Sequence, residues 1–263
     1  MTYNPFAELS ATIPATAMQA YVVLMFVLVV VGTLADIIHK KSAKFFFENT
    51  KRAEAARTRE VGSGEKTAIL VKTVASDVLT SSEFCNPHRR LAHLLTMYGF
   101  VAYVVTTGIL IFGHTDPAMA APSLVTALWH LGALAVCVGG YWFWFFIRVD
   151  VAAEGYPWYR FMRADLFVLS LLGSTTFALL WSLFQSNGGG MLSTICFCLF
   201  LTSNTVLFGG VLWSKFAHMF FKPAAAFQKH VAEADGSMDN LPPPADAPET
   251  MGLGIKRELP RHY

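Results

Sequence analysis

Charged side chains are scarce in this chain of 263 residues, where Asp, Glu, Lys and Arg together make up 14%. Soluble domains carry about 25%. Hydrophobic residues make up 54% of the chain, 22 of them phenylalanine, and the mean hydropathy is +0.45. This composition excludes an ordinary soluble enzyme and indicates an integral membrane protein. A net charge of +2 gives no reason to expect a nucleic-acid partner.

Cysteine is also scarce, with four residues, Cys85, Cys137, Cys196 and Cys198. No two of them form a CxxC pair, so the sequence supports neither an iron–sulfur site nor a zinc site. We interpret them as small apolar residues that pack. The segment before Met18 lacks a basic region, so we expect no cleavable signal peptide.

Long hydrophobic runs are what the chain has in abundance. Five of them are long enough to cross a hydrocarbon core, which takes about 20 helical residues. They are Met18–Ile38, Leu91–Phe112, Leu124–Ile147, Leu166–Phe184 and Met191–Phe221. In lipid such spans must be helical, because single strands would leave backbone groups unpaired. The sequence therefore predicts an all-α, five-helix membrane bundle, whose long fifth helix continues into the membrane interface.

Lys and Arg are absent from three segments: the residues before Met18, His114–Ser123 and Gln185–Gly190. They gather instead in Lys40–Arg90, in Arg148–Arg163 and after Phe221. Because basic loops stay in the cytoplasm, this pattern predicts an outer N-terminus and a cytoplasmic C-terminus in a bacterial inner membrane. The expected organisation is an outer end and first span (1–39), a cytoplasmic segment (40–90), spans two to five (91–221) and a cytoplasmic tail (222–263).

Both cytoplasmic segments are long enough to have structure of their own. In the first, we expect surface helices over Phe45–Glu60 and Ala68–Leu79, joined near Gly62, that lie on the membrane or hold a soluble partner; a solvated loop is the alternative. In the tail, the sequence predicts a short helix, Pro223–Ala234. A proline-rich extended stretch that cannot form a core follows it. Its end is either free or a strap ordered on a partner through Ile255, Leu259 and Tyr263.

Two histidines carry the main functional hypothesis. His93 lies just inside the second span and His218 just inside the end of the fifth, so both should lie about 3–6 Å from the cytoplasmic boundary. Facing imidazoles on two helices are what axial ligation of an electron-transfer haem requires. The alternative is a pair of interfacial histidines that bind lipid headgroups or a partner.

Polar residues around these histidines suit an anionic or quinone ligand. Lys215 lies one turn before His218 on the same helix face. Arg89 and Arg90 lead into the second span, where haem propionates or lipid phosphates are their natural partners, and His88 is a candidate quinone or proton contact. Lys215 can equally extend its amine to the interface.

Other polar positions give weaker signals. His114 and His130 lie at different depths near the outer side, which argues against a second haem there. Asp36 could relay protons or pair with nearby cations. Aromatic runs at Tyr141–Phe146 and Tyr156–Arg160 are typical of an interfacial belt.

The plan of five spans, with histidines on the second and fifth, resembles the fold of the respiratory nitrate reductase gamma subunit. The same fold occurs in the cytochrome b subunits of heterodisulfide reductases and of quinone-interacting membrane oxidoreductases. Ser81-Ser-Glu-Phe-Cys-Asn-Pro-His-Arg-Arg-Leu-Ala-His93 looks like the start of helix two in the last group. Ser214-Lys-Phe-Ala-His218-Met-Phe-Phe-Lys-Pro223 looks like the end of helix five. The likeness covers roughly residues 17–225.

The chain departs from two-haem members of that group at Tyr103 and Phe200, where those members carry two further histidines. The resemblance then implies at most one haem b, with His93 and His218 as its iron ligands, and a quinone as exchangeable substrate. A short chain of this kind is most similar to the membrane anchor of dissimilatory adenylylsulfate reductase, whose alpha and beta subunits are cytoplasmic. This implies a non-catalytic oxidoreductase subunit that links flavin and iron–sulfur chemistry to membrane quinone.

Three alternatives stay open at this point. One is a structural anchor that has lost its haem, and another is the cytochrome b subunit of a different quinone-interacting oxidoreductase. A transporter is the third, although the spans show no inverted repeat of broken helices and no charged cluster at mid-membrane.

Overall fold

The computed structural model describes residues 3–84, 86–214, 216, 218–238, 250–251 and 255–256. This part of the chain is helical, apart from a two-stranded antiparallel pairing of β1 (Thr250–Met251) with β2 (Ile255–Lys256). Its helices are α1 (Pro5–Leu9), α2 (Ala15–Lys40), α3 (Ser42–Ala56), α4 (Ser63–Thr73), the π-helix η1 (Val74–Leu79), α5 (Pro87–Gly113), α6 (Ser123–Trp142), the π-helix η2 (Phe143–Ile147), α7 (Val149–Ala152), the 3₁₀ helix η3 (Arg163–Asp165), α8 (Leu166–Ser186), α9 (Met191–Gly209) and α10 (His218–Ala234).

Five helices in this part of the chain are long and apolar enough to cross a membrane: α2, α5, α6 with η2, α8 with η3, and α9. They match the five predicted spans, and the protein is a multi-pass membrane protein with an all-α fold. The second span starts earlier than predicted, because α5 begins at Pro87 rather than at Leu91. Asn86 explains the earlier start, since its side chain caps the backbone N–H groups of His88 and Arg89.

The prediction that the fifth span runs unbroken to Phe221 was wrong. Helix α9 ends at Gly209, and turns follow through Ser214. Two consecutive glycines, Gly209 and Gly210, weaken the helix there. The Ser214 side chain then accepts a hydrogen bond from the backbone N–H of Phe216, 3.2 Å away. His218 therefore begins a separate helix, α10, which continues through Pro223 where the sequence predicted a helix start.

Close backbone contact joins α5 to α6. A methyl group placed on Gly99 would lie 2.7 Å from the carbonyl oxygen of Gly132, and one placed on Gly132 would lie 2.8 Å from that of Gly99. Only glycine allows this approach, which is how small residues bring membrane helices together. Helix α2 packs more lightly, against α5 and α9.

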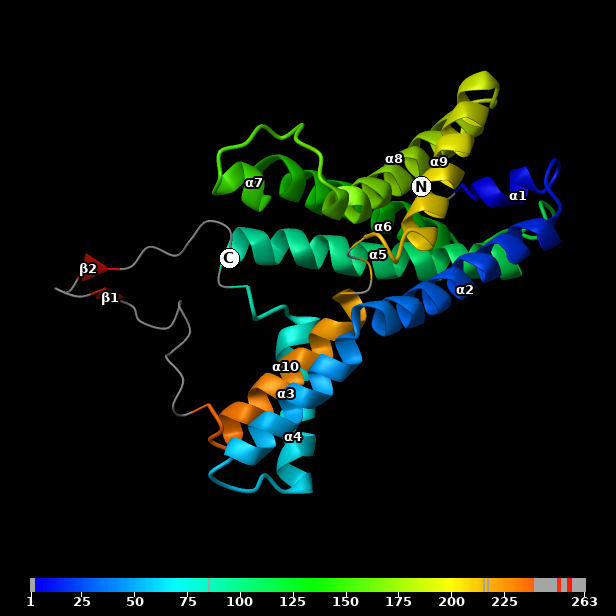
Figure 1. The fold of residues 1–263 in the computed structure, drawn as a ribbon. Coiled ribbons are helices and arrows are strands. Elements are labelled where there is room, and N and C mark those ends of the chain that lie inside the picture. The colour runs from blue at the N-terminus through cyan, green and yellow to red at the C-terminus, as the bar shows by residue number, and fades with distance from the viewer. Residues whose placement is uncertain are drawn as a thin grey trace.

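Outside the membrane bundle, α3, α4, η1 and α10 form a separate group of helices, which we call the cytoplasmic unit after the side of the membrane that the sequence predicts for it. This unit projects from one end of the bundle (Figure 1). The two helices predicted in the 40–90 segment are both present, with α4 continued by η1. Backbone N–H groups of Thr58 and Arg59 donate to the carbonyl of Asp235, at 2.9 and 3.2 Å, and so satisfy the C-terminus of α10. Arg59 also forms an ion pair with Glu65.

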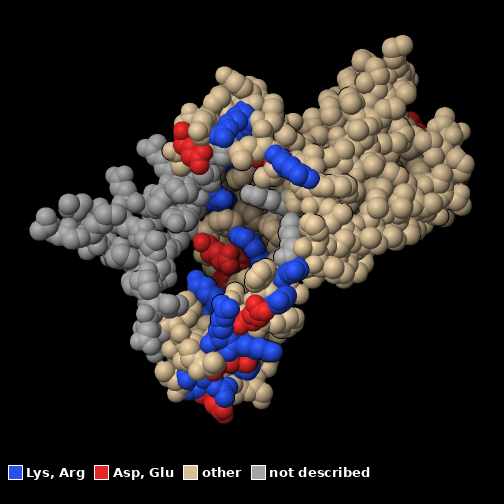
Figure 2. All heavy atoms as spheres, in the orientation of Figure 1, with Lys and Arg blue, Asp and Glu red and all other residues tan. Residues whose placement is uncertain are grey.

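Charge is concentrated at the same end of the molecule. Figure 2 shows Lys, Arg, Asp and Glu gathered over α3, α4 and α10 and around α7, whereas the bundle in that view is almost uncharged. The connection from η2 to α8 is held there by a buried ion pair, in which Arg148 donates to Asp165 over 2.7 Å. Phe146, Tyr159 and Phe161 on this connection are 60–71% exposed, as an interfacial aromatic belt requires.

The proline-rich stretch, Leu259 and Tyr263 lie outside the described residues, as do Cys85 and Lys215. The strap hypothesis for the tail therefore stays a prediction.

Candidate functional site

His93 lies in the second turn of α5, and its ring is held by the segment that precedes the helix. The Ser81 hydroxyl is 3.0 Å from the His93 Nδ1 atom, and the Phe84 ring lies 4.9 Å from the imidazole, centroid to centroid. With Nδ1 engaged by Ser81, Nε2 is the ring nitrogen left for a ligand. Fixing the ring through its second nitrogen is how proteins orient metal-binding histidines.

Ser81 itself is held in an unusual conformation. Its side chain is 2% exposed and its φ is +51°, in the left-handed region that non-glycine residues rarely adopt. The next residue, Ser82, donates to Asp77 Oδ1 over 2.6 Å, and Ser76 donates to the same oxygen over 2.9 Å. The turn that contacts His93 is therefore anchored to η1.

Helix α10 holds the other side of this turn. The His230 ring contacts two carboxylates, with Nε2 2.7 Å from Asp77 and Nδ1 3.0 Å from Glu233. Burial on its own would lower the pKa of His230, but the hydrogen bonds to the two carboxylates outweigh it and raise that pKa. Burial would likewise raise the pKa of Asp77, and its hydrogen bonds from Ser82, His230 and Ser76 lower it instead. This favours a charged pair that joins α10 to η1.

His218, the first residue of α10, faces the bundle. Its ring meets the Phe167 ring of α8 edge-on at 5.6 Å. Lys222, one turn after His218 on α10, lies 5.2 Å from the centroid of the Phe84 ring, which itself lies 4.9 Å from the His93 ring. The start of α10 therefore lies at the same end of the bundle as His93, and His218 arrives there on a separate helix.

Two cations flank the Phe84 ring beside His93. The Arg89 guanidinium lies 5.5 Å from the ring centroid and the Lys222 amine 5.2 Å from it. Lys222 also pairs with Glu83 at 3.6 Å. This arrangement gives His93 a positive rim that suits an anionic group.

The remaining predicted site residues lie elsewhere. The Arg90 side chain donates to the carbonyl of Thr80 over 2.7 Å, so it holds the turn rather than the histidines. His88 faces α6, with its ring 5.9 Å from that of Trp142. Lys215 lies outside the described residues, so its proposed role stays a prediction.

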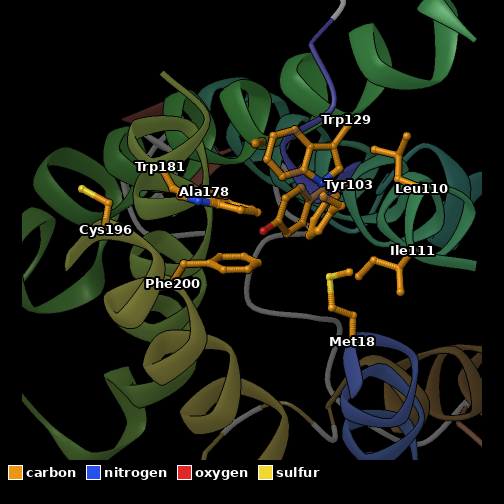
Figure 3. Close-up of a cluster of buried hydrophobic side chains, with 11 residues drawn as sticks. Met18, Tyr103, Leu110, Ile111, Trp129, Ala178, Trp181, Cys196 and Phe200 are labelled. Atoms are coloured by element: carbon orange, nitrogen blue, oxygen red, sulfur yellow. The ribbon is translucent and has the colours of Figure 1, made fainter. Parts of the chain in front are cut away.

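At Tyr103 and Phe200 an aromatic cluster fills the bundle. Tyr103 lies 5.7 Å from Trp129, and Phe200 stacks on Trp181 at 5.6 Å (Figure 3). Phe6 of α1 meets both tryptophans edge-on, at 5.6 and 5.3 Å. Aromatic packing thus occupies these two positions, and Tyr103 and Phe200 also line a cavity between α2, α5 and α9.

The His130 ring has partners for both of its nitrogens, whereas the buried Nδ1 atom of His114 has no hydrogen-bond partner among the described residues. In His130, Nδ1 lies 2.7 Å from the carbonyl of Thr126 and Nε2 lies 2.8 Å from the Ser182 hydroxyl, so both nitrogens are engaged. The carbonyl of His114 accepts from Asn4 over 2.7 Å, which ties α1 to the end of α5. Asp36, on α2, is 3% exposed.

A largely apolar cavity of about 320 Å³ lies beside the aromatic cluster, between α2, α5 and α9. Its outer end is lined by Phe6 and Leu9, and its other end by Phe216, Met219 and Phe220, next to His218. Phe100 also lines it and lies two turns from His93 on the same face of α5. Met18, Tyr103, Ile111 and Phe200, which line the cavity, are labelled in Figure 3. One end of the cavity is therefore lined by residues that neighbour His218 in the chain, although His93 and His218 are not among its lining residues.

Comparisons with protein families, with characterised proteins and with solved structures find no match to this chain. Function therefore rests on the site. Among the described residues, no group of three or more His, Cys, Asp or Glu side chains is placed to hold a metal ion. A haem, however, needs only two axial nitrogens and a shell of apolar and cationic groups. The oriented His93 ring, the nearby His218, the surrounding phenylalanines and the two cations fit that need.

Three features of this site lacked a sequence signal strong enough to single them out. The Ser81 contact depends on a left-handed backbone conformation, which a serine in the sequence does not predict. The role of Lys222 depends on α10 folding back against residues 83–84. The cavity depends on how far α2 stands from α5, which hydropathy does not report.

Proposed function

We propose that the protein is a membrane anchor and quinone-linked electron-transfer subunit for a cytoplasmic flavin and iron–sulfur enzyme. The enzyme we propose is a dissimilatory adenylylsulfate reductase with alpha and beta subunits. The observation that carries the electron-transfer part is the His93 ring, oriented by the Ser81 contact to Nδ1, at the end of the bundle where α10 begins with His218. The family assignment rests on the sequence resemblance around Ser81–His93 and Ser214–Pro223.

In this proposal, one haem b bound between His93 and His218 would supply a one-electron redox centre. Nε2 of His93 would be one of the two nitrogens that hold the iron, while Ser81 keeps Nδ1 engaged and so fixes the ring. Arg89 and Lys222 would hold the propionates as cations beside Phe84. The phenylalanines around the two histidines would exclude water. A quinone ring would then exchange protons only at the edge of the site that Arg89 and Lys222 form.

Orientation follows from the charge distribution. The cytoplasmic unit and the α7 connection carry the charged residues shown in Figure 2, and basic segments are retained in the cytoplasm. We place this end on the inner side of a bacterial cytoplasmic membrane, with the N-terminus outside. Redox chemistry and partner docking then occur on the same side.

The cytoplasmic unit gives the partner a surface that is mechanically joined to His93. His230 binds Asp77, Asp77 binds Ser82, and the neighbouring Ser81 binds His93. An enzyme docked on α3, α4 and α10 would therefore contact elements that hold the histidine. This supports an anchor whose docking surface and redox site are coupled.

A second candidate is a structural anchor without haem. Tyr103 and Phe200 stand where two-haem relatives have histidine ligands, and they pack against Trp129 and Trp181. This favours the structural anchor, because the inner haem could have been lost in the same way. In that case His93 and His218 would be polar residues that hold the cytoplasmic unit against the bundle.

A pyridine-haemochrome assay on the purified chain, together with a search for co-purifying soluble subunits, separates the two candidates. We expect about one haem b per chain, lost in His93→Ala and in His218→Ala but retained in His130→Ala. A folded wild-type chain without haem, whose partner enzyme still co-purifies, would leave only the structural anchor. Co-purification of a different soluble oxidoreductase would show that the partner is that enzyme and not an adenylylsulfate reductase.

A further inference from the structure

Gly108, in the middle of α5, has no packing reason to be glycine. A methyl group placed on it would have no atom within 4 Å, whereas one placed on Gly99 or Gly132 of the α5–α6 contact would collide with backbone. Glycine inside a helix costs about 1 kcal/mol relative to alanine. Close approach of a ligand to the backbone is one of the few reasons to keep it.

The space in front of Gly108 belongs to the cavity between α2, α5 and α9. Gly108, Val22, Phe26 and Val104 line this cavity and also an apolar groove on the other side of the α2–α5 contact. The groove is otherwise lined by exposed valines and phenylalanines of the two helices, such as Val23, Val30 and Phe112. Gly108 therefore stands at an opening between the cavity and the lipid.

The cavity has the shape and chemistry of a site for a chain rather than for a compact polar molecule. It runs from Phe6 at one end to Phe220 at the other, and its few polar groups include the hydroxyls of Tyr103 and Thr107. The Tyr103 hydroxyl already has a hydrogen-bond partner within the protein, the Ser174 hydroxyl 3.4 Å away. Its volume of about 320 Å³ is within the range of small-molecule sites.

We propose that this cavity holds the isoprenoid chain of the quinone, which enters beside Gly108, with the quinone ring at the His93–His218 end. This rests on the proposed function, which places quinone chemistry at those histidines. Fifteen residues separate His93 from Gly108, or about 22 Å along the helix axis. A quinone with a single isoprene unit cannot reach Gly108, but a long-chain quinone can. The cavity should therefore discriminate between quinones by the length of their isoprenoid chain.

The test compares a long-chain isoprenoid quinone with a single-isoprene analogue, binding to the full chain in nanodiscs of defined phospholipid. We expect wild type to bind the long-chain form at least about tenfold more tightly, because the cavity buries several methylene groups. Gly108→Leu should remove this advantage and leave binding of the short analogue unchanged. Gly108→Ala should have an intermediate effect, since a methyl group meets no protein atom there.

Gly113→Leu is the matched control. Gly113 lies on the same helix, also has no atom within 4 Å of an added methyl group, and does not line the cavity. It should behave as wild type, and thermal unfolding of both leucine variants checks that they fold. Retention of the long-chain advantage in Gly108→Leu would overturn the cavity assignment while leaving the quinone function intact.

Two further outcomes are distinct. Wild type that binds neither quinone would overturn the proposed quinone function, and the chain site with it. Native mass spectrometry can also detect a phospholipid bound to wild type and lost in Gly108→Leu. If that loss occurs while quinone binding stays the same, the cavity is an acyl-chain site and our proposal is wrong.

Discussion

Ser81 and His93 meet across the start of α5, with the serine hydroxyl 3.0 Å from Nδ1 of the imidazole. Ser81 reaches this position only because its backbone adopts φ +51° in a turn fixed by Ser82 and Asp77. A buried polar contact that depends on an unfavourable backbone conformation needs support from its surroundings. Here η1 and α10 provide that support, so the cytoplasmic unit sets the orientation of a membrane histidine.

Removal of the Ser81 hydroxyl should weaken haem binding. Ser81→Gly deletes the hydrogen bond and tolerates the positive φ, so it isolates the contact from backbone strain. We expect a loss of about 10–100-fold in haem affinity, as for other partners of metal-binding histidines. Competition for haem with an apo-globin measures this loss.

The same change should also shift the haem reduction potential upward, because an imidazole without its acceptor is less basic and stabilises ferric iron less. Ser186→Gly serves as the control, since Ser186 donates to the carbonyl of Leu183 at the end of α8, away from His93. Ser81→Asn, which also tolerates φ above zero, should restore part of the affinity. Equal haem affinity and potential in wild type and Ser81→Gly would show that the contact does not position the ligand.

Attachment of α10 to η1 should depend on pH through His230 and Asp77. The raised pKa of His230 means that its contribution is complete below the ordinary histidine value of 6.5 and is lost as pH rises through the folded-state pKa. The lowered pKa of Asp77 means that its contribution is present above 3.8 and is lost as pH falls through its own folded-state pKa. The pair is therefore strongest between these values.

Hydrogen exchange of the α10 amides at about pH 6 and about pH 8.5, corrected for intrinsic rates, measures this dependence. We expect weaker protection at the higher pH in wild type and no such difference in His230→Gln. The loss should be about 1.5 kcal/mol, the lower end for a hydrogen bond to a charged group, because the His230 side chain is 28% exposed. His39→Gln, outside the cluster, should keep the wild-type pH profile.

Breaking the Arg148–Asp165 pair should destabilise the chain strongly. Their side chains are 6% and 14% exposed, so Asp165→Leu leaves a buried cation without its partner carboxylate. The expected cost is about 3–5 kcal/mol, and Arg148→Met with Asp165→Leu together should recover most of it. Thermal unfolding in detergent reports both values. Glu48→Ala, which breaks the exposed Lys44–Glu48 pair, should change stability by less than about 1 kcal/mol.

The α5–α6 contact should not tolerate side chains larger than glycine. In Gly99→Val, the new Cβ would lie 2.7 Å from a backbone carbonyl of α6, which cannot move aside without separating the helices. We expect a loss of about 3 kcal/mol or more, seen as a lower unfolding temperature. Gly113→Val should have little effect, since nothing lies within 4 Å of its added Cβ. Similar unfolding temperatures for the two variants would contradict close packing at Gly99.

Hydropathy predicted the five spans well, because the need for about 20 apolar residues is nearly independent of tertiary structure. It failed at Gly209–Gly210, where the apolar run continues to Phe221 but the helix does not. The residues on both sides are equally hydrophobic, so only the glycine pair marked the break. For the same reason, the sequence placed His218 at the right end of the bundle on the wrong helix.

At the candidate site, the sequence placed Arg89 and His88 at the entry to the second span and proposed both as ligand contacts. Arg89 lies beside Phe84 near His93, whereas His88 faces Trp142 of α6. Ser81 and Lys222 could not be predicted, because their positions depend on the turn after η1 and on the docking of α10. The Lys222 contact joins segments that α5, α6, α8 and α9 separate along the chain, and the Ser81 contact depends on the backbone conformation of a turn. Local periodicity carries no information about them.

The loose contact of α2 with α5 and α9 has a consequence for biosynthesis. Helix α2 precedes α5, α6, α8 and α9 along the chain, so it leaves the ribosome before them. The cavity between α2, α5 and α9 cannot exist until α9 is inserted, so the side chains of α2 that line it face lipid while the other helices assemble. The cavity therefore takes its final form inside the bilayer, among the lipophilic molecules that the bilayer contains.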